Sequence, residues 1–164
     1  MRTAFAAVGV ALVMAGGVVS PALAAPPERT FFTDQQTREV TSVCPFTVTV
    51  VATFPDTRQV DFYSRDGVLK RTAYHIVEQD TFTANGKTLV GVPYRFRTVA
   101  NFDESGEVTS AYGTGHHVRV PLPGGRTFFV AGRVNFLQQV NDFVWLPDSG
   151  ASKNAAAFCA ALAR

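Results

Sequence analysis

Apolar and polar residues alternate along most of the middle of the chain, and this period of two is typical of β-strands. In residues 46–53, Phe46, Val48 and Val50 fall on one face while threonines mostly fall on the other. β-Branched and aromatic residues dominate such stretches, as they do in strands. The same pattern predicts further strands over residues 58–63, 68–77, 79–84, 87–92, 94–102, 108–120, 126–137 and 140–146.

Short turn signals separate these stretches. Asp66-Gly67 and Asn85-Gly86 are hairpin turns, and residues 104–107 and 121–125 are rich in glycine, serine and proline. The fold class expected is all-β: an antiparallel β-barrel, or a sandwich, of about eight strands. We favour the barrel because closure removes exposed edges. An alanine-rich stretch then predicts a short C-terminal helix over about residues 151–163.

The N-terminal residues have the features of a secretory signal peptide. Arg2 is followed by an apolar run over residues 4–19 and by an A-x-A cleavage site at Ala22-Leu23-Ala24. A membrane anchor is the alternative, but the run is shorter than the ~20 residues that span a bilayer. We therefore expect a signal peptide over residues 1–24, a flexible N-terminal arm over 25–38, and a single β-barrel domain over 39–164. The expected location is extracellular, as a secreted protein with no membrane contact after cleavage.

Charge gives little indication of a partner. Fifteen lysines and arginines balance thirteen acidic residues in a scattered arrangement, which does not predict binding to nucleic acid. Arg95, Arg97, Arg119 and Arg133 are expected on outward strand faces. They could form a basic patch for polyanionic glycans, although ordinary solvated strand faces are the interpretation we favour.

Cys44 and Cys159 are the two cysteines of the chain. An even pair in an exported protein predicts one disulfide, here tying the first predicted strand to the C-terminal helix. The alternatives are a redox pair, which usually places the cysteines two residues apart, and a zinc site, which needs more ligands.

The adjacent histidines His116 and His117 raise the question of a metal site. Neighbouring side chains on a strand point to opposite faces, so the pair cannot easily hold one ion, and we expect neither a metal nor a cofactor. If Val118 and Val120 point inward, uninterrupted alternation places His116 inside and His117 in solvent. His116 is then either an ordinary hydrogen-bonded interior residue or, with Tyr112 and Thr114, part of a ligand-binding cavity.

Four segments carry a family resemblance. They are Cys44-Pro45-Phe46-Thr47-Val48-Thr49-Val50, Gly113-Thr114-Gly115, Gly132-Arg133-Val134-Asn135-Phe136 and Phe158-Cys159-Ala160-Ala161-Leu162-Ala163. Together they resemble a group of small exported actinobacterial proteins with a signal peptide and one cysteine pair. The resemblance implies a small β-barrel, similar in outline to the lipocalin and allene-oxide-cyclase barrels. It implies no activity.

No catalytic motif stands out: the chain has no Gly-x-Ser-x-Gly elbow and no phosphate-binding loop before a helix. We therefore expect a non-enzymatic exported β-barrel that binds a small apolar ligand or acts as an interaction module. The alternative is a cofactor-free isomerase or cyclase similar to allene oxide cyclase. That activity would need a polar cluster in the barrel, for which His116, Tyr112, Tyr94 and Asn101 are the candidates. The oligomeric state stays open.

Overall fold

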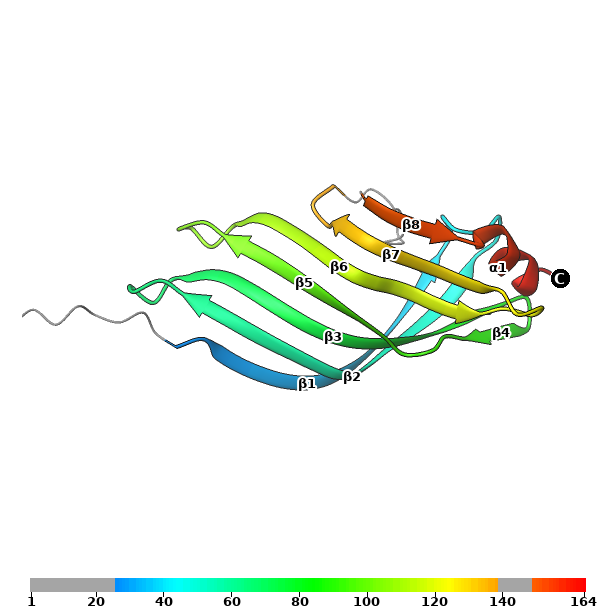
Figure 1. Ribbon diagram of the computed structural model, residues 1–164, viewed down its shortest axis with the longest axis horizontal. Helices are drawn as coiled ribbons and strands as arrows, with labels where there is room; N and C mark the ends of the chain where they lie inside the picture. Colours follow the sequence, from blue (N-terminus) through cyan, green and yellow to red (C-terminus); the bar gives the residue numbers. More distant parts are fainter. Residues whose placement is uncertain (1–25, 139–148) are drawn as a thin grey trace, which may run out of the picture.

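The computed structural model describes residues 26–138 and 149–164, and these form one antiparallel sheet with a short helix (Figure 1). The expected signal peptide, and the strand expected over 140–146, lie outside the described residues. The elements, in chain order, are β1 (Glu28–Val40), β2 (Val48–Tyr63), β3 (Leu69–Ala84), β4 (Lys87–Val90), β5 (Tyr94–Phe102), β6 (Val108–Pro121), β7 (Thr127–Asn135), β8 (Ser149–Lys153) and α1 (Ala155–Leu162).

The eight strands confirm an all-β antiparallel fold with a C-terminal helix. Their spatial order is β1-β2-β3-β5-β6-β7-β8, and β4 pairs with β3 alongside this path. In the part of the chain that the structure describes, β1 and β8 form the two ends of the sheet and do not pair with each other. The sheet is therefore open between these two strands.

Two pairs of expected strands are single long strands in the structure. β2 continues through Pro55 as a β-bulge. Around this proline, β2 has one more residue than the facing segments of β1 and β3. Such a bulge leaves a backbone group unpaired, so a proline is tolerated there. β3 likewise continues through Glu78, where the sequence predicts a break between two strands.

The flexible arm expected over residues 25–38 is replaced in the structure by a strand. Glu28–Val40 form β1, which pairs with β2 along its length. Residues Glu28 to Thr37 are exposed, so neither face of this part of the strand is buried, and only Val40 at its end reaches the core. Without a buried face there is no apolar alternation for the sequence to show. The helix is also shorter than expected, because Ser149–Lys153 pair with β7 as β8.

The core lies at the end of the molecule that carries α1. There β1 and β2 bend behind the other strands (Figure 1), and their valines pack with side chains of β3, β6, β7 and the helix. The Phe158 ring contacts Phe82 edge-on at 5.1 Å and Phe128 at 4.6 Å between ring centroids. The predicted disulfide is confirmed: Cys44 and Cys159 are bridged, with their Cα atoms 5.5 Å apart.

The sheet has two faces with different chemistry. We call the side that carries Val50, Phe82 and Val130 the core face. The opposite side carries Arg58, Arg97 and Arg133, and we call it the arginine face. The faces follow from strand alternation, since residues directly opposite each other on paired strands share a face.

Candidate functional site

Five residues form one continuous line of cross-strand neighbours on the arginine face. Arg58 on β2 lies opposite His75 on β3, and His75 lies opposite Arg97 on β5. Arg97 lies opposite Thr114 on β6, and Thr114 lies opposite Arg133 on β7. We call these five residues the arginine row. Neighbouring strands are about 4.8 Å apart, so the row spans about 20 Å and its arginines recur about every 10 Å.

The row is bounded on both sides. The next line of residues toward the β2–β3 and β5–β6 turns is uncharged: Val60, Ala73, Val99, Tyr112 and Asn135. The next line toward the helix places Asp56, Val77 and Arg95 opposite one another, so that it holds one carboxylate and one guanidinium. The row therefore holds three of the arginines of this face, while Arg95, Arg71 and Arg119 lie on the same face outside it.

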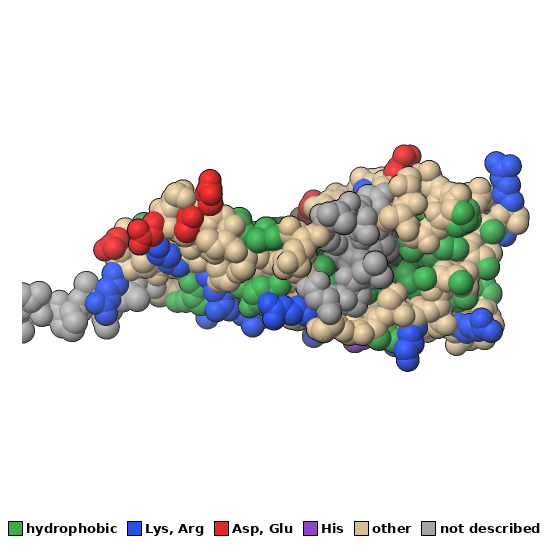
Figure 2. All heavy atoms as spheres, turned by 90° about the horizontal axis from the view of Figure 1, so that it is seen from above, with side chains coloured by type: hydrophobic (Ala, Val, Ile, Leu, Met, Phe, Trp, Pro, Cys, Tyr) green, Lys and Arg blue, Asp and Glu red, His purple; other side chains and the backbone are tan. Residues whose placement is uncertain are grey.

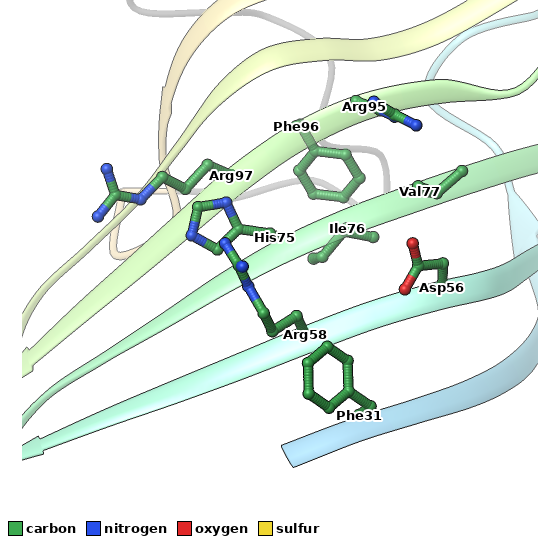
Figure 3. Close-up of a pocket in the computed structure, with 9 residues that line it drawn as sticks. All are labelled: Phe31, Asp56, Arg58, His75, Ile76, Val77, Arg95, Phe96 and Arg97. Carbon is green, nitrogen blue, oxygen red and sulfur yellow. The ribbon is translucent and has the colours of Figure 1, made fainter. Parts of the chain in front are cut away.

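A groove of about 440 Å³ covers the β2 to β5 part of the row and extends to Phe31 on β1. Figure 3 shows Phe31, Arg58, His75 and Arg97 along one line over four strands, with Arg95 and Asp56 to one side. Phe31 projects from β1 opposite Arg58 and is 67% exposed. The described lining residues include three arginines and one carboxylate, Asp56.

The electrostatics of the groove favour an anion. Burial lowers the pKa of His75, and the charges of Arg58 and Arg97 lower it further, so His75 is neutral at neutral pH. The Nε of Arg58 is buried and has no hydrogen-bond partner, which leaves a donor available. Figure 2 shows lysine and arginine side chains along one long edge of the molecule and acidic side chains at the end opposite α1.

The far end of the row is held by an aromatic ring. The guanidinium of Arg133 lies over the ring of Tyr112, 4.5 Å from its centroid. Arg71, further along the same face, lies over the ring of Phe62 at 5.0 Å. These cation–π contacts restrict the arginines while leaving their N–H groups free to donate at the guanidinium edge.

The adjacent histidines are placed the opposite way from the sequence prediction. His117 is buried at 2% exposure, and His116 is exposed on the arginine face. β6 has one extra residue between His116, opposite Ala131, and Val118, opposite Val130. This bulge shifts the alternation by one position, so His117 and Val118 both point to the core face.

His117 is held as an interior residue. Its Nε2 lies 3.3 Å from the carbonyl oxygen of Gly132, and its ring lies 5.4 Å from that of Phe96. A Cβ at Gly113 would lie 3.0 Å from the imidazole and 3.0 Å from the Phe136 ring, so both rings would have to shift to admit it. Burial lowers the pKa of His117, which makes it neutral at neutral pH.

The ligand-site residues expected from sequence lie outside the core. Tyr112, Thr114 and His116 all lie on the arginine face, and Thr114 belongs to the arginine row. Asn101, a candidate for the isomerase alternative, lies on the same face and donates a hydrogen bond to Ser110. The expected interior cluster is therefore not formed by these residues.

A different polar cluster lies on the core face. The Tyr94 hydroxyl donates a 2.6 Å hydrogen bond to Oδ2 of Asp80, which is 1% exposed, and Glu78 lies beside Asp80 on β3. Burial raises the pKa of Glu78 to about 9, with the Asp80 charge as the next cause. Burial also raises the pKa of Asp80. Oδ1 of Asp80 has no partner and is the acceptor available to a protonated Glu78.

The sequence does not identify Arg58 and His75 as site residues, although it offers Arg97 and Arg133 for a basic patch. Within residues 26–138 and 149–164, no three metal-ligating side chains come together, and no helix is long and apolar enough to cross a membrane.

No protein-family model, curated protein or solved structure matches the chain.

Proposed function

We propose that this protein is an exported, non-enzymatic interaction module that binds an acidic polysaccharide along the arginine row. The observation that carries the proposal is the cross-strand register, which aligns Arg58, Arg97 and Arg133 in one line on one face. Guanidinium groups donate paired hydrogen bonds to carboxylates, sulfates and phosphates, and these charge-assisted bonds are stronger than neutral ones.

The length of the row favours a polymer over a small anion. The backbone positions of its arginines are about 10 Å apart and the row spans about 20 Å, so it is much longer than a single carboxylate or phosphate. A chain of anions can contact all three. The groove is open along this line and is continued at the β1 edge by the exposed ring of Phe31, which can pack on a sugar ring.

The aromatic residues favour a polysaccharide over a single-stranded nucleic acid. Nucleic acids bound without sequence preference usually stack their bases on exposed aromatic rings. Near the row, Tyr112 lies under Arg133 and Phe62 lies under Arg71, so one face of each ring is already occupied. Phe31 is exposed beside the groove, but a single ring provides no platform for stacking successive bases. The expected export and the resemblance to small exported proteins also support an extracellular polymer as the partner.

The five residues of the row lie on β2, β3, β5, β6 and β7, all of which belong to the described sheet. The isomerase or cyclase alternative needs acid–base groups that a substrate can reach. Tyr94, Glu78 and Asp80 are each at most 5% exposed, which makes this the weaker proposal.

A small apolar ligand remains a second candidate because the core face has a groove of its own. This groove has a volume of about 290 Å³ and is lined by Phe32, Phe54 and Ile76 together with several polar side chains. Thr57 lines it, is 3% exposed, and has a hydroxyl without a hydrogen-bond partner. Fluorescent lipophilic probes test this candidate: binding that Phe54→Asp removes would support it, and no binding would reject it.

The test of the main proposal is a calorimetric titration of the folded chain with a soluble polyuronate at low and moderate salt. Replacing Arg58, Arg97 and Arg133 together with glutamine should remove binding. Arg119→Gln removes an exposed arginine of the same face outside the row, and should bind like the wild type. Equal binding by the triple variant and the wild type would reject the row as the site.

A further inference from the structure

The arginine row alternates charged and uncharged side chains from strand to strand. Arg58, Arg97 and Arg133 lie on β2, β5 and β7, while His75 and Thr114 lie on the two strands between them. Threonine carries no charge, and the lowered pKa of His75 leaves that ring neutral at neutral pH. Two guanidinium groups are thus always separated by a neutral side chain that can both donate and accept a hydrogen bond.

The spacing of residues along the row is similar to the spacing of sugars in an extended polysaccharide. A sugar in an extended chain advances by roughly the distance between two neighbouring strands, which is about 4.8 Å. A polysaccharide lying along the row would therefore place about one sugar over each strand. Every second sugar would meet a guanidinium, and the sugars between would meet His75 or Thr114.

An acidic group placed over a neutral residue of the row gains less binding energy than one placed over an arginine. A carboxylate beside Thr114 would lose part of its hydration and receive one neutral hydrogen bond, whereas a carboxylate beside Arg97 receives charge-assisted bonds. The adjacent lines of residues do not supply the missing charge at Thr114, because one is uncharged and the charged residues of the other, Asp56 and Arg95, lie on β2 and β5 with Val77 between them. A hydroxyl or acetamido group, by contrast, is well matched to the Thr114 hydroxyl.

We propose that the row selects a polysaccharide in which acidic and uncharged sugars alternate, over one that is charged at every sugar. This inference rests on the proposed function and makes it more specific. It assigns Arg58, Arg97 and Arg133 to the acidic sugars, and His75 and Thr114 to the neutral ones. It also states that the polymer crosses the strands and does not run parallel to them.

The experiment compares two oligosaccharides of equal length at pH 7.5: a hyaluronan fragment, in which uronate and N-acetylhexosamine alternate, and a fragment of a homopolymeric uronate. We expect the alternating chain to bind about tenfold more tightly, although it carries half the charge. Simple attraction by charge density predicts the opposite order. Tighter or equal binding of the homopolymer would overturn the inference.

A pair of variants tests the assignment of Thr114. Thr114→Lys adds a charge at a neutral position of the row and should shift the preference toward the homopolymer. His116→Lys is the matched control, since His116 is exposed two residues along the same strand and face but outside the row. If both variants shift the preference equally, the position of the added charge does not matter, and the inference that the row distinguishes acidic from neutral sugars fails.

Two further results separate the inference from the proposed function. If neither oligosaccharide binds at low salt, the proposed function itself fails. If both bind with equal affinity and both lose binding in the triple glutamine variant, the proposed function stands and the alternation is wrong. His75→Lys provides a second charged variant at the other neutral position, should Thr114→Lys fail to fold, and the same shift toward the homopolymer is expected.

Discussion

Arg97 on β5 and His75 on β3 lie directly opposite each other, and His75 has Arg58 on its other side. Burial and these two positive charges hold the pKa of His75 below its usual value. An acidic polymer that neutralises both arginines removes the electrostatic part of this effect. We therefore predict that the pKa of His75 rises when polyuronate binds.

The measurement is an NMR titration of the imidazole signals with and without polymer. The bound protein should hold more protons near pH 6, so affinity should increase as the pH falls through that range. An unchanged His75 pKa at saturating polymer would contradict binding at this position.

Much of the sheet could be predicted from sequence where one face of a strand is buried. β5 has the predicted bounds, Tyr94 to Phe102, and the predicted disulfide is present. β1 could not be predicted in this way, because Glu28 to Thr37 have no buried face and show no apolar alternation. Its partner β2 determines its position.

The candidate site could not be predicted from the alternation of apolar and polar residues, because it also depends on the register between strands. The period of two assigns Arg97 and Arg133 to a face, but it does not say which residues of other strands lie opposite them. The bulges in β2 and β6 set that register, and they shift the alternation without a clear sequence signal. For this reason the prediction for His116 and His117 was wrong, and Arg58 and His75 were not recognised as neighbours of Arg97.

The buried carboxyls predict how stability depends on pH. Glu78 has a pKa of about 9 in the folded protein, above its ordinary value of 4.5 in the unfolded chain. The folded state therefore keeps a proton that the unfolded state loses between these values. The contribution is complete below pH 4.5 and is lost as the pH rises toward 9, by up to about 1.4 kcal/mol per pH unit.

Glu78→Gln keeps an uncharged hydrogen-bonding group and should reduce this loss. Urea unfolding at several pH values between 5 and 9 measures the effect. The variant should show a shallower decrease in unfolding free energy than the wild type, while the exposed control Glu107→Gln should follow the wild type. Parallel curves for Glu78→Gln and the wild type would show that Glu78 ionises in the folded state as it does in the unfolded one.

The disulfide joins the segment after β1 to α1, across 115 residues of sequence. Bridges that close long loops restrict the unfolded chain, and loss of a native one typically costs 2–5 kcal/mol. We predict a destabilisation of about 2–5 kcal/mol for the double variant Cys44→Ala/Cys159→Ala. Chemical denaturation measures it, with reduced wild type as the comparison. A change below about 1 kcal/mol would mean that packing of Phe158 alone holds the helix.

Gly132 has a backbone role at the pairing of β7 with β8. Its φ is +142°, and a Cβ there would collide with the backbone of Ser149 and Gly150. Gly132→Ala should therefore weaken the β7–β8 pairing as well as strain its own backbone. Gly106→Ala is the matched control, because Gly106 also has a positive φ, of +86°, but has no atom within 4 Å of the added Cβ.

The predicted loss of unfolding free energy is about 1 kcal/mol for Gly106→Ala and at least twice that for Gly132→Ala. Amide hydrogen exchange adds a local readout, since protection in Ser149–Lys153 should fall in Gly132→Ala alone. Equal destabilisation with unchanged protection in β8 would refute the proposed collision.

The most direct test of the arginine row observes its guanidinium groups during binding. Arginine Nε–H correlations can be followed by NMR while the chain is titrated with the alternating hyaluronan fragment. The signals of Arg58, Arg97 and Arg133 should shift together with one dissociation constant, while that of Arg119 should stay in place. Shifts confined to Arg119 and other residues outside the row, or saturation without any shift in the row, would contradict the proposed binding site.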